Sequence, residues 1–412
     1  MTSKSNYQEA YVWIWLPDAI KPVVAGKLEQ DGENLLFTYG KSYLERKNAI
    51  SIYEPELPLK PGTLSPLTGL SVPNCIRDAS PDAWGRRVII NRLQGAAYEN
   101  ELTYLLESGS DRIGTLDFQA SPTEYVPRQT QGATLEELME SAERVEKGIP
   151  LSLELDQALF HGSSIGGARP KALIQDGNKK YIAKFSAGND TYSVVKAEFI
   201  AMRLAHLAGL NVAPVKMVDA AHKDVLLIER FDRLPAKQGW HRKAIVSALT
   251  LFELDEMMAR YASYEKLAEI IRHRFTAPTD TLKEMFARMV FNILCGNTDD
   301  HARNHAAFWD GKSLTLTPAY DICPQGRAGG EATQAMLITG SNRFSQIKTC
   351  LEAAHNFRLS EEEATAIITH QKTVIEDNWD RVCDEANLSE IDRKLFWHRQ
   401  FLNPYAFEEF EA

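Results

Sequence analysis

The chain has 412 residues, of which 44% are hydrophobic and 25% charged, the composition of an ordinary soluble globular protein. This length predicts two or more domains, or one large unit with two lobes. The formal net charge of −10 and the isoelectric point near 5.6 argue against a broad surface that neutralises phosphates. They leave open a local basic groove, or DNA contact through a partner.

Five cysteines are scattered along the chain, and none stands in a C-x-x-C pair. This pattern favours a reducing compartment over a disulfide framework or a zinc site. The first ten residues are polar, and no apolar run approaches the roughly eighteen residues that a membrane helix needs. The sequence therefore predicts a cytoplasmic protein that makes no membrane contact.

The first third of the chain is predicted to mix strands with short helices. Tyr11–Trp15 and Leu35–Tyr39 are rich in β-branched and aromatic residues, and an Asp-Gly turn precedes the second run, so residues 10–60 are expected to be strand-rich. The next expected elements are a helix over 83–93, a shorter helix between 100 and 120, and a linker with two prolines over 121–133.

From residue 134 onward, helices and strands are predicted to alternate. Val194–Ala208 has the apolar spacing of a helix and ends at Gly209, a residue suited to close it. The other elements expected here are a helix over 135–145, a small-residue loop over 162–171, and strands over 171–174, 181–185 and 224–229.

Beyond Asp232 the chain is predicted to be mainly helical. Apolar residues of Leu282–Leu294 repeat on one helix face. Ser360 and Glu363 form a capping box that opens a helix reaching about Asp384. Strands first and helices last indicate the α+β class, with a mixed lobe followed by a helical lobe.

The most informative segment is Cys295–Phe308, which reads CGNTDDHARNHAAF and directly follows the apolar helix. Asp299 and Asn304 stand five positions apart in it. The base and the metal-binding asparagine of the protein-kinase catalytic loop, H-R-D-x4-N, have the same separation. One short loop can thus aim a proton acceptor and a magnesium ligand into one cleft. The pair alone is weak evidence, because Asp and Asn are common in loops.

Other features of a kinase occur in the expected order. The loop at 162–171 would let backbone N–H groups approach phosphates. Lys184 stands in an apolar strand, with Glu198 fourteen residues later. Asp321 follows a short strand, where a second magnesium ligand belongs. Taken singly, the loop could be a tight turn, Lys184 a solvated lysine and Asp321 a capping carboxylate. Their occurrence in the order found in kinases favours the kinase.

His301 and His305 raise a competing hypothesis, because with Asp299 and Asp300 they could build a metal centre for hydrolysis. No H-E-x-x-H motif is present, and no third His or Cys stands at ligand spacing. We therefore expect His301 to organise the loop and His305 to pack in the interior.

Four segments carry a family resemblance that covers nearly the whole chain. They read SPDAWGR at 80–86, SIGGA at 164–168, TDDHARN at 298–304 and YDI at 320–322. In these segments the chain resembles the HipA family of bacterial serine/threonine kinases, the toxin halves of toxin–antitoxin pairs. The resemblance implies a two-lobed, protein-kinase-like fold with three parts: an N-terminal α/β subdomain over 1–130, a nucleotide-binding part over 131–232 and a helical lobe with the catalytic loop over 233–412.

The resemblance also implies roles for single residues. Asp299 would be the proton acceptor, and Asn304 and Asp321 would hold Mg²⁺. Ser164 would be autophosphorylated, with Ser163 as the alternative, and this would inactivate the kinase by displacing the phosphate loop. The residues implied at the nucleotide are Ser164, Ile165, Gly166, Gly167, Ala168, Arg169, Lys171, Lys184, Glu198, Glu229, Arg230, Phe231, His301, Arg303, Asn304, Tyr320 and Asp321.

ATP and Mg²⁺ are the implied cofactors, and a small helix-turn-helix antitoxin, similar to HipB, is the implied partner. DNA would be contacted only through the antitoxin. The implied target is a protein, for which the family suggests glutamyl-tRNA synthetase. Two departures stand out, since Asp300 occupies a position expected to be glycine, and Arg169-Pro170 replaces the more usual Gln-Glu.

The rival reading is a catalytically silent, nucleotide-binding corepressor that acts with its antitoxin. A protein that had lost catalysis would be expected to lack at least one of the key polar residues. All four are present, which favours the enzyme: Lys184, Asp299, Asn304 and Asp321.

Overall fold

The computed structural model describes residues 7–93, 100–128, 133–151, 155, 164, 167–188, 190–327 and 329–410. The chain divides into two compact units. Within the described ranges, no helix is long and apolar enough to cross a membrane. The first unit comprises Met1–Asn189, Asp219–Val246 and Phe308–Lys312, and the second comprises Asp190–Val218, Ser247–Ala307 and Ser313–Ala412.

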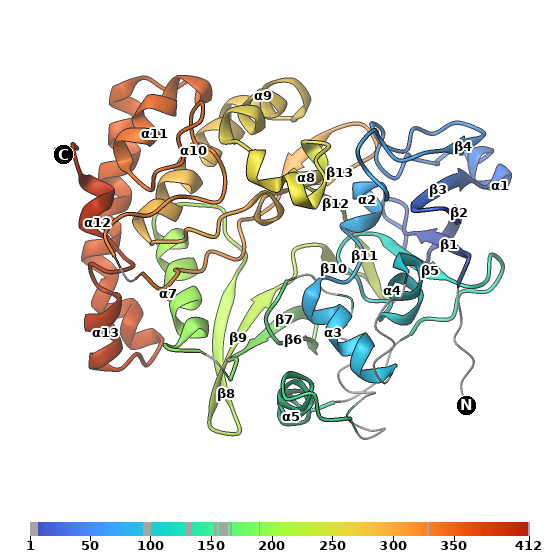
Figure 1. Cartoon of the computed structure of the whole chain (residues 1–412), viewed down its shortest axis with the longest axis horizontal. Helices are drawn as coiled ribbons and strands as arrows, with labels where there is room; N and C mark the ends of the chain where they lie inside the picture. Colours follow the sequence, from blue (N-terminus) through green and yellow to red (C-terminus); the bar gives the residue numbers. More distant parts are fainter. Residues whose placement is uncertain are drawn as a thin grey trace. The chain divides into compact units, whose positions relative to one another are not determined.

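The first unit begins with an antiparallel sheet in the order β4-β3-β2-β1-β5 (Figure 1). The predicted strands near 11–15 and 35–39 are confirmed as β1 and β3. The strands are β1 (Glu9–Ile14), β2 (Val23–Asp31), β3 (Asn34–Tyr39), β4 (Thr63–Leu64) and β5 (Leu116–Gln119). The helices are α1 (Lys41–Leu44), α2 (Asn74–Arg77), α3 (Ala83–Arg92) and α4 (Glu101–Glu107).

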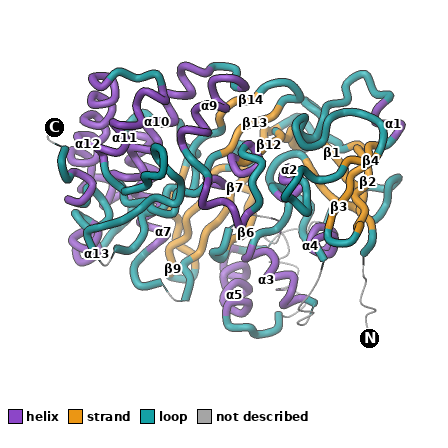
Figure 2. Tube along the Cα trace, turned by 45° about the horizontal axis from the view of Figure 1, so that its top comes forward, coloured by secondary structure: helices purple, strands orange, loops and turns teal. Residues whose placement is uncertain are grey.

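A second sheet has the order β6-β7-β9-β8. Helix α5 (Leu135–Glu146), which opens with a capping box of Thr134 and Glu137, lies beside this sheet (Figure 2). The predicted strands and the predicted helix are thus confirmed. The strands are β6 (Lys171–Asp176), β7 (Lys179–Phe185), β8 (Val215–Ala220) and β9 (Lys223–Glu229).

The second unit is mostly helical. The predicted helix over 282–294 is the core of α10 (Pro278–Leu294), whose apolar face is buried. Ser360 and Glu363 form the predicted capping box of α12 (Glu361–Glu385). The other helices are α7 (Val194–Leu207), α8 (Ala248–Leu251), α9 (Tyr264–Arg274), α11 (Ile347–Ala353) and α13 (Glu390–Phe396). The predicted α+β class is confirmed.

Two features differ from the expectation. Helix α7 groups with the helical unit, because Arg203 pairs with Glu385 and Lys196 donates to the carbonyl of Asn387. The domain boundaries predicted at 130/131 and 232/233 stay predictions. The chain after Asp232 also holds strands of three or four residues, too short to show an alternating pattern. They are β10 (Arg233–Pro235), β11 (Trp240–Arg242), β12 (Ala244–Ser247), β13 (Ala306–Trp309) and β14 (Leu314–Leu316).

Candidate active site

The loop predicted to be catalytic follows α10 and begins with a turn that only glycine can make. Gly296 has φ +73°, and a Cβ there would stand 2.5 Å from the carbonyl oxygen of Gln400. The N–H of Gln325 donates to the carbonyl of Gly296 at 3.0 Å. The loop that carries Asp299 is therefore fixed at its base by two distant segments of the same unit.

Asp299 and Asp300 face different environments although they are neighbours. Asp299 is exposed, whereas Asp300 is only 2% exposed. Although Asp299 as a whole is exposed, the surrounding protein partly desolvates its carboxylate and so raises its pKa; His301 opposes this shift, and the carboxylates of Asp321 and Asp300 add to it. A base with a raised pKa accepts a proton more readily, which suits general-base catalysis.

Two polar contacts place the proposed metal ligands beside Asp299. The side-chain amide of Asn304 donates to the carbonyl of Asp299 at 3.3 Å, which leaves its oxygen as the group for a cation. The hydroxyl of Tyr320 donates to the carbonyl of Arg303 at 2.7 Å and so ties the segment of Asp321 to the loop. Asp321 itself has φ +58°, a left-handed conformation that Asp tolerates better than most residues.

This arrangement fits Mg²⁺. Carboxylate and amide oxygens are the donors that Mg²⁺ takes, usually one or two carboxylates together with substrate phosphates. The negative charge of Asp321 helps to raise the pKa of Asp299, and a divalent cation would relieve such repulsion. No cluster of three or more His, Cys, Asp or Glu side chains able to hold a metal occurs in the described ranges.

Asp300 and His305 belong to a buried network. The Tyr264 hydroxyl, at the start of α9, donates to Asp300 and lies 3.3 Å from Nε2 of His305. His305 Nε2 is 3.2 Å from Oδ2 of Asp300. Asp300 therefore does more than add charge beside the base, since it joins the catalytic loop to α9. The expected interior position of His305 is confirmed, and its Nε2 is directed at Asp300 instead of at a hydrolytic metal centre.

Two further residues of the loop, His301 and Arg303, make contacts outside this network. His301 lies beside Asp299 and opposes the rise of its pKa, which agrees with the organising role expected for it. The side chain of Arg303 turns to Glu256, with 3.3 Å between Nη1 and Oε1. The role of Arg303 at the nucleotide stays a prediction.

The predicted phosphate loop lies only partly within the described residues: Ser163, Ile165 and Gly166 fall outside them. Ser164 is 2% exposed, and its hydroxyl has no hydrogen-bond partner among the described residues. Gly167 has φ +102°, and the ammonium of Lys171 lies where a Cβ of residue 167 would stand. Ala168 and Arg169 follow at the surface of the unit.

Lys171 and Lys184 stand directly opposite each other on β6 and β7 and so point to one face of the sheet. They are 4% and 8% exposed, so the reading of Lys184 as a solvated lysine is wrong. Two buried ammonium groups on one face favour an anion there, and phosphates supply that charge. Glu198 is buried on α7 in the other unit, and its pairing with Lys184 stays a prediction.

The segment Glu229–Phe231, which the family resemblance places at the nucleotide, is held mainly by ion pairs and hydrogen bonds. Glu229 pairs with Lys179 at 2.6 Å, and Phe231 packs edge-on against Phe308. Arg230 is buried and donates to Asp111 and Asp232, while its N–H donates to the carbonyl of Lys180. The side chain of Arg230 is therefore structural, and only its carbonyl remains for a nucleotide.

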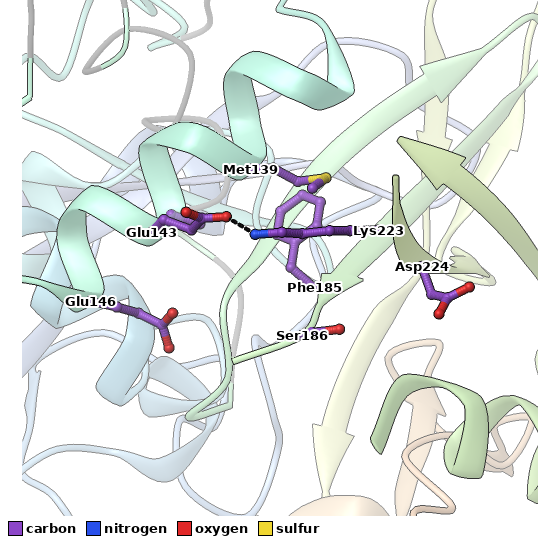
Figure 3. A pocket seen from close by; sticks show the side chains of 8 residues that line it. Met139, Glu143, Glu146, Phe185, Ser186, Lys223 and Asp224 are labelled. Carbon is purple, nitrogen blue, oxygen red and sulfur yellow. Dashed lines mark hydrogen bonds and ion pairs between the residues drawn. The ribbon is translucent and has the colours of Figure 1, made fainter. Parts of the chain in front are cut away.

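A small pocket on the first unit is separate from these residues. It lies between α5 and the ends of β7 and β9, where Lys223 pairs with Glu143 and Met139 lies next to Phe185 (Figure 3). Phe185 and Lys184 are neighbours on β7 and point to opposite faces. The α5 side of the sheet is thus the face away from the two buried lysines.

Three contributing residues were not predicted from the sequence. Tyr264 carried no signal, because a tyrosine at a helix start is unremarkable until Asp300 is found beside it. Asp82 and Trp84 were noticed only as part of a family motif, and the structure shows both bonded to the phosphate loop.

Comparisons with known proteins show the family to which the chain belongs. The model of the HipA-like C-terminal domain matches residues 163–379, and the model of the HipA N-terminal domain matches residues 16–119. A solved chain in the complex of HipA, HipB and operator DNA from Shewanella oneidensis MR-1 has a TM-score of 0.73 and 21% identity, with 96% of this chain and 97% of that chain covered. This similarity shows the fold.

Two curated relatives carry the names of kinases. One is the serine/threonine-protein kinase toxin HipA of Shewanella oneidensis, 26% identical over 62% of this chain and 65% of that protein, so slightly less than two thirds of it is spanned. Another is the putative kinase Y4mE of Sinorhizobium fredii, 24% identical over 73% of this chain and 74% of that protein. Because the C-terminal family model alone spans more than half of the 412 residues, the chain belongs to the HipA family.

Proposed function

We propose that the protein is an ATP- and magnesium-dependent serine/threonine kinase. The observation that carries this proposal is the pair of hydrogen bonds that joins Asn304 to Asp299 and Tyr320, the neighbour of Asp321, to the same loop. Asp299 would accept the proton of the substrate hydroxyl, and Asn304 and Asp321 would hold Mg²⁺. In the other unit, the buried pair Lys171 and Lys184 would bind phosphates.

Catalysis in such a site depends mainly on positioning and charge. Bound Mg²⁺ would neutralise the charge on the phosphates. The raised pKa of Asp299 makes it a better proton acceptor, and the hydrogen bond from Tyr320 to Arg303 fixes the segment of Asp321 next to it.

We infer further that the kinase is a cytoplasmic toxin that phosphorylates a protein target and is restrained by a small helix-turn-helix antitoxin. The relative named as a kinase toxin and the solved complex of HipA with HipB and operator DNA support this. The net charge of −10 favours DNA contact through the antitoxin over direct contact. Glutamyl-tRNA synthetase is the first target to test, together with whole lysate depleted of it.

Self-inactivation would act through Ser164. A phosphate adds about −1.5 to −2 charges at neutral pH. A charged phosphate cannot be accommodated at the buried position of Ser164, so phosphorylation would move the loop out of that position. Peptide mapping of active wild type beside Asp299→Gln tests this step, which requires phosphate on Ser164 in the former and none in the latter. Phosphate on neither, or equally on both, would contradict it.

The kinase itself is tested by incubating the purified protein with labelled ATP, Mg²⁺ and candidate targets, with phosphate located by mass spectrometry. Transfer to a serine or threonine supports the proposal. Absence of transfer to any protein, with ATP still bound, would favour the silent corepressor.

A further inference from the structure

The segment Ser80–Arg86 is bonded to the phosphate loop at three points. The carboxylate of Asp82 accepts a hydrogen bond from the N–H of Gly167 at 2.7 Å. The backbone N–H of Trp84 donates to the carbonyl of Gly167 at 3.2 Å, and its indole N–H donates to the carbonyl of Lys171 at 3.2 Å. Residues more than eighty positions apart are thus joined within one unit.

The side chain of Asp82 bonds to the loop and not to its own helix. It occupies the N-cap position of α3, where an Asp side chain ordinarily accepts a hydrogen bond from the second or third helical N–H. Here the side chain makes no capping bond. The Asp82 carboxylate therefore holds the loop at Gly167 and does not cap α3.

The loop needs such an anchor because of its composition. Gly167 is in the left-handed region and has the greatest conformational freedom of any residue type. The ammonium of Lys171 lies beside it, and the φ of +102° is a conformation that residues with a Cβ rarely adopt. Bonds from outside the loop are therefore the available way to fix residues 167–171.

The anchor is itself held firmly. Arg86 donates to both carboxylate oxygens of Glu101 at 2.8 and 2.7 Å, and its Nε donates to the carbonyl of Pro81 at 3.0 Å. Trp84 is only 1% exposed. The segment therefore has a fixed position against which the loop can be ordered.

We propose that Asp82, with Trp84, is a positioning residue for ATP binding, which orders Gly167–Lys171 before the nucleotide arrives. This rests on the proposed kinase function. Asp82 does not touch the phosphates. It acts by holding the loop and the Lys171 ammonium in the place where phosphates would bind, which lowers the entropy lost on binding. The N-terminal part of the chain would then be a working part of the nucleotide site.

The test compares Asp82→Ala and Asp82→Asn with wild type in ATP binding, steady-state kinetics and amide hydrogen exchange. Asp82→Ala should raise KM and Kd for ATP about tenfold, because it removes a charge-assisted hydrogen bond that orders the loop. kcat at saturating ATP should change less than about threefold. Asp82→Asn, which keeps an acceptor oxygen, should recover most of the affinity. Asp392→Ala removes a surface carboxylate at the start of α13 and should change nothing.

Hydrogen exchange gives a second readout that needs no activity. Without nucleotide, the peptide covering 164–171 should exchange faster in Asp82→Ala and at the wild-type rate in Asp392→Ala. Trp84→Phe removes the indole N–H and keeps an aromatic ring, and it should also speed exchange. It serves as the second variant in case Asp82→Ala does not fold. Unchanged exchange with unchanged KM would overturn the anchor, as would a loss of kcat alone. If wild type transfers no phosphate, the kinase proposal fails, and the exchange result still decides whether Asp82 orders the loop.

Discussion

The hydroxyl of Tyr264 donates a hydrogen bond to the carboxylate of Asp300, which lies 36 positions further along the chain. Asp300 is the neighbour of the proposed catalytic base, Asp299. The side chains of Tyr264 and Asp300 are both buried, and His305 completes the contact. The start of α9 therefore holds the catalytic loop from inside the second unit.

Tyr264→Phe should lower both stability and turnover. It leaves a buried carboxylate with one partner fewer, which costs about 1–3 kcal/mol, and it loosens the loop that carries Asp299. Chemical denaturation and kcat measured on the same preparation check this. Tyr261→Phe, at an exposed position, is the matched control. A Tyr264→Phe protein as stable and as active as wild type would show that the network has no such role.

The two buried lysines give a second prediction. Lys184→Met or Lys171→Met should weaken ATP binding roughly ten- to hundredfold, since each removes a cation from the face where phosphates would bind. Lys223→Met, which removes an exposed lysine paired with Glu143, should leave ATP binding unchanged. Titration with a fluorescent ATP analogue measures all three. Wild-type affinity for ATP in all three variants would show that the phosphates do not bind at Lys171 and Lys184.

The opposed lysines also show where sequence reasoning succeeds and where it stops. The strands that carry Lys171 and Lys184 were predicted, because a short β-branched and aromatic run has a local signature. Their pairing depends on the register of β6 with β7, which residues outside either strand decide. The burial that excludes a solvated Lys184 is likewise a tertiary property.

Magnesium dependence separates the two proposed ligands. Asp321→Asn should raise the Mg²⁺ concentration needed for half-maximal activity more than Asn304→Ala does, because it removes a charged donor. The amide is also suited to the left-handed backbone at this position, so the change tests charge and not folding. Activity measured against Mg²⁺ at saturating ATP decides it. An unaltered Mg²⁺ requirement in Asp321→Asn would assign the metal to another carboxylate.

The buried ion pairs of Arg230 and Arg233 with Asp232 make the stability of the fold depend on pH. Burial acts to raise the pKa of Asp232, but Arg230 and Arg233 outweigh it and lower this pKa to about 2. Since the folded-state pKa lies below the unfolded value of about 3.9, the stabilisation is present above pH 4 and is lost as the pH falls toward 2.

Asp232→Asn should therefore destabilise the protein by about 3–5 kcal/mol at pH 7, because it leaves Arg230 and Arg233 buried with less opposing charge. The difference from wild type should shrink as the pH falls below 4. Denaturation curves at pH 7, 4 and 3 measure it. A difference that stays constant or grows toward pH 3 would contradict this reading of the cluster.

The catalytic loop was predictable from its spacing, whereas its support was not. Asp299 and Asn304 are separated by a fixed number of residues, so one loop shows both. Tyr264, Asp82 and Gln400 reach their partners only through the fold, and no local pattern marks a residue that will be bonded to a loop many positions away. The contact of Asp300 with Tyr264 was not predictable for the same reason.

Asp299→Asn gives the most direct test of the account, measured as phosphate transfer and ATP binding on one preparation. The account predicts that transfer from labelled ATP falls about 10²–10⁴-fold, because the amide cannot accept the hydroxyl proton. ATP affinity should stay close to that of wild type, since Asp299 is not a proposed phosphate or metal ligand. Transfer near the wild-type rate in this variant would contradict the assignment of the catalytic loop and, with it, the proposed kinase.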